Sequence, residues 1–315
     1  MKDAFMSNGK EYNAEMKRKK NMMKPSSQFT KTTSPLLEVK RLSVSFRQLQ
    51  QGLRETNTQV IQQFDLTIHE GEIVAVVGAS GSGKSILADT ILGILPSYAQ
   101  VKGTMKYQGQ VLTEKKQEVL RGNEIFLIPQ SVNALDPLMK SGKQVRSMIR
   151  KNNKDAHLDR IFEKVGLSSY TKDLYPFELS GGMARRVLLS AAFVSEAKLI
   201  IADEPTPGLD IKVLNETTNM MKELANEGKG MMFITHDITT ALDLADKIAV
   251  VHAGEMIEMA KAEDFTGKGE KLSHPYTKAL WNALPQNDFV PSPESPTAEN
   301  EIKSNESEGF SHVRG

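Results

Sequence analysis

Short apolar runs alternate with longer amphipathic stretches through the middle of the chain. The apolar runs predict strands at 36–46, 61–68, 72–77, 199–202, 231–235 and 247–252. The run at 72–77 is almost continuously apolar, which is typical of a parallel strand buried on both faces. A helix is predicted from Lys84 to about Leu95. This alternation predicts a layered α/β fold.

The outer parts of the chain differ in composition from the middle. From about 131 to 190 the strand pattern gives way to a mostly helical one, so we expect a helical subdomain inserted into the α/β core. Residues 1–34 carry eight basic side chains against three acidic ones, which predicts a disordered basic leader. Residues 286–315 are rich in Pro, Ser and Glu and predict a disordered acidic tail. One folded domain is therefore expected at 35–285.

Composition narrows the class of protein. The 315 residues include 40 Lys and Arg against 39 Asp and Glu, so the net charge of +1 gives no reason to expect nucleic acid as a partner. The absence of cysteine excludes disulfides and thiolate metal sites and fits a reducing cytoplasm. No apolar run approaches the ~18–20 residues of a membrane helix. We expect a soluble protein, so another chain must cross the bilayer in any membrane process.

A glycine-rich loop follows the strand predicted at 72–77 and precedes the predicted helix. It fits the pattern GxxxxGK[ST] with Gly78, Ala79, Ser80, Gly81, Ser82, Gly83, Lys84 and Ser85. Glycines let successive N–H groups point inward, and the helix N-terminus adds positive potential where phosphates bind. Lys84 supplies a charge for the β- and γ-phosphates, and the Ser85 hydroxyl can ligate Mg²⁺. The loop therefore predicts Mg-ATP binding.

A second acidic site follows the strand predicted at 199–202. Asp203 can hold Mg²⁺ from the phosphate edge of the sheet, and Glu204 can orient the attacking water. An Asp-Glu pair after a strand is by itself more often a helix cap. The interpretation of this pair as part of a catalytic site depends on three further motifs, which are Leu179-Ser-Gly-Gly-Met183, Gly208-Leu-Asp210 and Thr235-His236-Asp237.

Together these five motifs resemble the cassette of ABC transporter ATPases, in the same order and at matching spacing. Ser180 and Asp203 are 23 residues apart, and Glu204 and His236 are 32 apart. The resemblance covers about residues 36–285. It implies a P-loop NTPase (RecA-like) core with an inserted α-helical subdomain and a small N-terminal antiparallel β part.

The resemblance also implies a role for each motif. Phe46 is placed to stack on adenine, and Gln130 to contact Mg²⁺ and the attacking water. Glu204, His236, Gln130 and Lys84 form the catalytic set, while Ser85, Gln130 and Asp203 hold Mg²⁺. The turn formed by Ser180, Gly181 and Gly182 grips the γ-phosphate of a partner's ATP, and Asp210 lies at the dimer interface. Two cassettes thus close around ATP and open after phosphate release.

Several stretches resemble the oligopeptide/nickel importer branch, above all 36–46 and 274–285. The resemblance implies a second ATPase subunit, two permease subunits, an extracytoplasmic solute-binding protein and a place on the cytoplasmic face of the membrane. Met183 in place of the usual glutamine and a shortened stretch at 130–137 favour the nickel or metallophore members slightly over peptide importers.

Two other interpretations remain open from the sequence. One is a soluble ABC ATPase that acts on ribosomes or DNA, which only the basic leader favours. The other is a catalytically silent subunit that completes its partner's site, which the presence of Lys84, Asp203, Glu204 and His236 disfavours. The five remaining histidines have no metal-like spacing.

Overall fold

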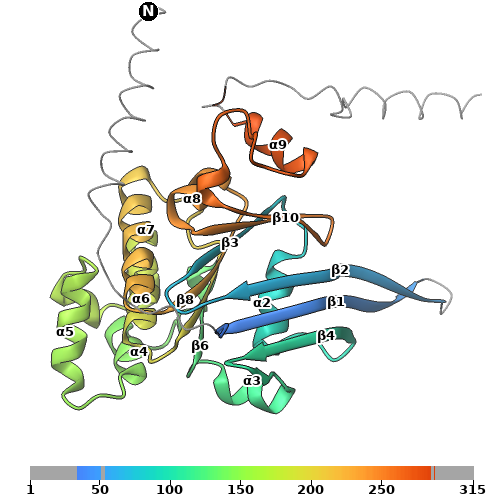
Figure 1. Cartoon of the computed structure of the whole chain (residues 1–315). Helices are drawn as coiled ribbons and strands as arrows, with labels where there is room; N and C mark the ends of the chain where they lie inside the picture. The colour runs from blue at the N-terminus through green and yellow to red at the C-terminus, as the bar shows by residue number, and fades with distance from the viewer. Residues whose placement is uncertain (1–33, 51–53, 285–286, 288–315) are drawn as a thin grey trace, which may run out of the picture. The chain divides into compact units, whose positions relative to one another are not determined.

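A ten-stranded sheet runs through the part of the chain that the computed structural model describes, namely residues 34–50, 54–284 and 287. Its order is β5-β4-β1-β2-β10-β9-β3-β8-β7-β6 (Figure 1). The strands are β1 (Leu37–Gln50), β2 (Arg54–Ile68), β3 (Ile73–Gly78), β4 (Ala99–Tyr107), β5 (Gln110–Val111), β6 (Ile125–Ile128), β7 (Leu199–Asp203), β8 (Gly230–Thr235), β9 (Lys247–His252) and β10 (Glu255–Lys261). Apart from Ser34 and Asn287, the leader and tail expected at 1–34 and 286–315 lie outside the described residues.

The central strands β9, β3, β8, β7 and β6 are parallel neighbours. Strands β3 and β8 are buried at every position, which confirms the parallel strand predicted from the apolar run at 72–77. Helices cover parallel sheets because each crossover needs a long connection. The helices α2 (Lys84–Leu92) and α8 (Ile238–Leu244) contact strands of this central part.

An antiparallel part adjoins the parallel strands, as expected. Strand β1 pairs antiparallel with both β2 and β4, and β4 with β5. Strands β1 and β2 are longer than the predicted 36–46 and 61–68, because their far ends pair with each other through polar residues that carry no apolar pattern. The sequence also gave no prediction of β4, whose residues 101–104 are exposed.

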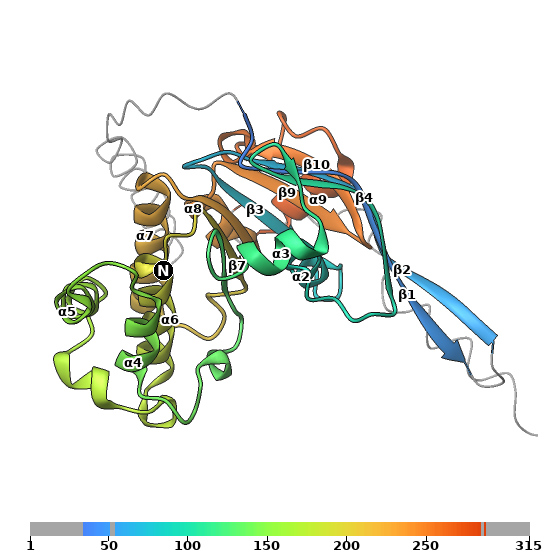
Figure 2. The same ribbon diagram turned by 90° about the horizontal axis from the view of Figure 1, so that it is seen from below.

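Helices gather at the other end of the sheet (Figures 1 and 2). They are α4 (Ser141–Met148), α5 (Lys154–Lys164), α6 (Gly181–Val194) and α7 (Ile211–Asn226). The first three share a core of their own that includes Val145, Phe162, Val165 and Val187. Between 131 and 194 the described chain is thus helical or irregular, and α6 continues four residues past the expected limit of 190.

The described residues from 266 onward, which are 266–284 and 287, belong to a second compact unit. Its described part contains α9 (Pro275–Asn282), where the buried Trp281 donates its indole N–H to the carbonyl of Gly267 at 3.0 Å. Within the described residues of either unit, no helix is both long and apolar enough to span a bilayer.

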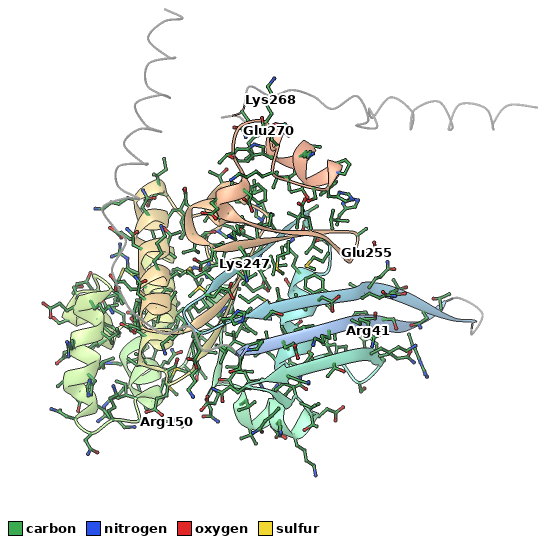
Figure 3. All side chains as sticks on the ribbon, in the orientation of Figure 1. Arg41, Arg150, Lys247, Glu255, Lys268 and Glu270 are labelled. Atoms are coloured by element: carbon green, nitrogen blue, oxygen red, sulfur yellow. The ribbon has the colours of Figure 1, made fainter. Side chains whose placement is uncertain are left out.

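A buried carboxylate fastens the start of β3 to the start of β9. Glu72 is 8% exposed and lies 2.7 Å from Lys247 Nζ (Lys247 is labelled in Figure 3) and 2.8 Å from His69 Nδ1. It also accepts the backbone N–H of His69 at 2.9 Å. Burial alone would raise the pKa of Glu72, but these hydrogen bonds outweigh it, and the pKa lies below its usual range. The charged form therefore stabilises the fold.

We expect Glu72→Gln to lower the free energy of unfolding by about 1–3 kcal/mol at pH 7, since it removes a charge from a hydrogen-bonded buried group. The folded-state pKa lies below the unfolded value of about 4.3. The contribution is therefore present above that value and is lost as the pH falls through the folded-state pKa. Urea unfolding between pH 7 and pH 2 measures it. A deficit that stayed constant down to pH 2, or an equal deficit in the exposed control Glu163→Gln, would contradict the assignment.

Candidate functional site

Four strands deliver the candidate site residues to one edge of the sheet. Strands β3, β6, β7 and β8 are parallel, so their carboxyl ends meet at the same edge. The residues there are the loop that starts at Gly78, the Pro129–Gln130 segment after β6, Asp203 with Glu204, and His236 just after β8. Segments far apart in the sequence thus converge at this edge.

The loop at 78–85 has the backbone of a phosphate-binding cradle. A Cβ atom on Gly78 would lie 2.3 Å from the carbonyl oxygen of Val251, so only glycine fits there. Gly81 and Gly83 have φ values of 80° and 92°, which glycine tolerates without strain. The Ser82 hydroxyl is buried and has no hydrogen-bond partner in the described part of the chain. Helix α2 begins at Lys84 and aims its N-terminus at the loop.

Lys84 lies inside this loop rather than in solvent. Its side chain is buried and donates hydrogen bonds to the carbonyl oxygens of Gly78 and Ala79, both at 2.8 Å. Burial lowers the pKa of Lys84, and the carboxylates of Glu204 and Asp203 only partly oppose that shift. A buried ammonium beside the cradle is a ready electrostatic partner for phosphate oxygens.

Oxygen donors for a divalent cation converge next to Lys84. The Ser85 hydroxyl donates to Asp203 Oδ1 at 3.2 Å. Burial raises the pKa of Asp203 and the Glu204 charge adds to the shift, while the Ser85 hydrogen bond and Lys84 oppose it. A hydroxyl, a carboxylate and the Gln130 amide are the hard oxygen ligands that Mg²⁺ prefers. The residues present therefore fit Mg²⁺, and Ser85, Asp203 and Gln130 would hold it.

Glu204, at the end of β7, contacts residues that follow β6 and β8. Its Oε2 atom lies 3.1 Å from His236 Nδ1 and accepts from Gln130 Nε2 at 3.5 Å. The backbone of Glu204 has a φ of 41°, in the left-handed region, which costs a residue other than glycine of the order of 1–3 kcal/mol. Such strain is typical of side chains that are held for chemistry. These contacts bring together a carboxylate, an imidazole and an amide.

The remaining predicted site residues lie on other elements. Phe46 is half-buried on β1, and its ring centroid lies 5.9 Å from that of Tyr98. Ser180 caps α6, and its hydroxyl accepts the N–H of Met183 at 3.2 Å. No hydrogen bond joins the turn at 180–182 to the loop at 78–85 within the described residues.

Asp210 is a helix cap in this chain. Its carboxylate accepts the N–H of Val213 at 2.9 Å at the start of α7.

The glycines of the first turn of α6 are accessible. Gly182 is partly exposed, and a Cβ on Gly181 would meet no atom within 4 Å. The backbone N–H groups of Gly181 and Gly182 are therefore open in the first turn of α6, whereas that of Met183 is bonded to the Ser180 hydroxyl.

Sequence reasoning missed two residues around the site. Arg185 is buried and donates to the carbonyl oxygens of Pro129 and Gln130, both at 2.9 Å. Tyr98 is exposed and packs its ring against Phe46. No motif marks either one, because each contact joins residues more than fifty positions apart in sequence. Among the described residues, no group of three or more His, Cys, Asp or Glu could hold a metal by itself.

Comparison with known proteins identifies the family. The family model of the ABC transporter matches residues 61–207. The oligopeptide transport ATP-binding protein OppD of Lactococcus lactis subsp. cremoris (strain SK11) is 32% identical over 269 residues, which cover 81% of this chain and 77% of that protein. OppD of Bacillus subtilis (strain 168) is 34% identical over 79% of this chain and 72% of that protein.

Solved structures agree on the fold. A dimeric post-hydrolysis structure of the ATP-binding cassette MJ0796 bound to ADP and Pi matches with a TM-score of 0.63 at 24% identity, over 72% of this chain and 98% of that one. The chain therefore belongs to the ABC transporter ATP-binding subunits of the oligopeptide/dipeptide family, and it is an ATPase whose hydrolysis of ATP drives transport.

Proposed function

We propose that the chain energises a membrane importer as one of two ATPase subunits on the cytoplasmic face of the membrane. Two permease subunits and an extracytoplasmic solute-binding protein complete the assembly, and no nucleic acid takes part. The observation that carries this proposal is the convergence of Gln130, Glu204 and His236 beside a phosphate loop. The transport names of the relatives favour it over an ATPase that acts on ribosomes or DNA.

ATP binds with its phosphates in the loop at 78–85, where backbone N–H groups and Lys84 receive the β- and γ-oxygens. Mg²⁺, when bound, neutralises charge that develops on the phosphates. Glu204 accepts a hydrogen bond from the attacking water and orients it in line with the γ-phosphorus. His236, which lies 3.1 Å from the Glu204 carboxylate, stabilises the charge that builds on the γ-phosphoryl group.

The second half of the site comes from another cassette. The turn at 180–182 sits at the N-terminus of α6 and leaves its N–H groups open. That geometry suits an anionic γ-phosphate from outside the chain. We place the partner's ATP there, with Asp210 at the dimer interface. Phe46, braced by Tyr98, offers its ring to the adenine of this chain's own ATP.

The Glu204→Gln change should lower kcat for ATP hydrolysis by about 10²–10³, because the neutral amide orients water poorly. ATP binding should persist, so ATP and the closed dimer accumulate. Phosphate release and size-exclusion chromatography with Mg-ATP measure the two effects. Glu118→Gln on the exposed face of α3 (Glu114–Leu120) serves as the control. Hydrolysis close to the wild-type rate would remove Glu204 from this role.

The imported substrate is a peptide or a nickel/metal chelate. Relatives named for oligopeptide and dipeptide transport favour the peptide. Met183 and the shortened stretch at 130–137 are the residues that favour the metallophore members. The cognate solute-binding protein distinguishes them when it is screened against both classes of ligand.

The segment at 130–140 is the proposed contact for a permease helix. Leu138 is 88% exposed there, so its apolar side chain is accessible to a partner. Asp136 holds the segment by accepting the N–H of Leu138 at 2.9 Å, while its own N–H donates to Gln144 at 2.9 Å. The segment thus presents an apolar side chain on a turn that the Asp136 hydrogen bonds hold.

Affinity purification of the tagged chain from detergent-solubilised membranes tests the assembly. We expect mass spectrometry to identify two integral permeases and a second cassette. Asp136→Lys should reduce the recovery of the permeases, whereas Glu163→Lys on the exposed face of α5 should not. Recovery with ribosomes or DNA and without permeases would overturn the importer assignment but leave the ATPase chemistry intact.

A further inference from the structure

Helix α6 carries a buried charge that has no acidic partner. Arg185 is 5% exposed, and no carboxylate forms an ion pair with it in the described part of the chain. Burial lowers the pKa of Arg185, and its Nε atom has no hydrogen-bond partner among the described residues. A guanidinium held in this way is costly, since desolvation is not offset by an opposite charge. Its position therefore calls for an explanation other than stability.

The partners of Arg185 are two consecutive backbone carbonyls. Nη1 donates to the oxygen of Pro129 and Nη2 to the oxygen of Gln130, both at 2.9 Å. The first carbonyl belongs to the peptide group before the Cα of Gln130, and the second to the peptide group after it. The planar fork of one guanidinium thus holds both peptide planes that flank Gln130.

Holding both peptide planes sets the direction in which the Cα–Cβ bond of Gln130 leaves the backbone. Its amide reaches Glu204 Oε2 at 3.5 Å from the end of β6. Among the side-chain hydrogen bonds of the described residues, only those of Arg185 join α6 to residues 129–130. A rotation or shift of α6 would therefore move the Gln130 amide relative to the Glu204 carboxylate.

The same helix begins with the turn proposed to bind the partner's ATP. Arg185 lies three residues after Gly182, so one rigid helical turn separates the two contacts. We propose that Arg185 is a positioning residue that couples the turn at 180–182 to Gln130, so that seating of the partner's ATP sets the geometry of this chain's own catalytic centre. This coupling rests on the proposed dimeric function.

The neighbouring arginine supplies a matched control. Arg186 donates to the carbonyl oxygen of Gly166 at 3.0 Å and pairs with Glu216 on α7. Like Arg185, it anchors α6 to other elements. Within the described residues, however, it forms no hydrogen bond with residues 129–130. Loss of Arg186 therefore removes an anchor of α6 without removing the link to Gln130.

The test is a double-mutant cycle in the complete transporter reconstituted in proteoliposomes. Arg185→Met keeps the length of the side chain and removes its donors. We expect kcat for ATP hydrolysis to fall about tenfold or more, since small misplacements of a catalytic group have effects of this size. The KM for ATP should stay within about twofold. In a Gln130→Ala background the same change should cost less than about twofold, because Arg185 acts through Gln130.

Three results would overturn the proposal: a full tenfold loss again in the Gln130→Ala background, a rise in KM with kcat unchanged, or an equal loss of kcat in Arg186→Met. If Arg185→Met does not fold, Arg185→Lys, which keeps the charge but not the fork, enters the same cycle with the same criteria. Wild-type transporter that fails to hydrolyse ATP would refute the proposed function. If the wild-type transporter hydrolyses ATP and the Arg185 and Gln130 substitutions have additive effects, the coupling is refuted and the proposed function stands.

Discussion

Four parallel strands have their carboxyl ends at the same edge of the sheet, and this common direction brings together groups that are distant in sequence. Strand β3 delivers the phosphate loop, β6 delivers Gln130, β7 delivers Asp203 and Glu204, and β8 delivers His236. The loop supplies N–H groups, and the other three strand ends supply carboxylates, an imidazole and an amide. Each side chain is displaced if its strand shifts, so the buried sheet fixes the catalytic geometry.

The site nevertheless remains half complete within one chain. The turn at 180–182 starts a helix whose first N–H groups are open, and no hydrogen bond ties it to the phosphate loop in the described part of the chain. A second cassette explains this arrangement, because each chain then lends its α6 turn to the other's nucleotide. In the proposed mechanism, hydrolysis waits for closure, and the proposed link from α6 through Arg185 to Gln130 carries the effect of closure to the catalytic centre.

Local patterns in the sequence predicted the elements that carry the chemistry. The apolar run at 72–77, the glycines of the loop and the strand before Asp203 are each decided by neighbouring residues, so β3, α2 and β7 were found close to their true limits. Strand β4 was missed because its exposed residues carry no apolar alternation. Contacts such as Glu72 with Lys247 or Arg185 with Gln130 join distant segments, and no short-range pattern encodes them.

The measurement that tests this account most directly is amide hydrogen exchange with and without Mg-ATP. In the isolated chain, ATP should slow exchange at residues 78–85 and leave Gly181 and Gly182 unchanged. In the complex with the partner cassette, with Glu204→Gln to hold the closed state, exchange at these two glycines should slow as well. ATP-dependent protection of Gly181 and Gly182 in the isolated chain, or none there in the complex, would contradict a site shared between two cassettes.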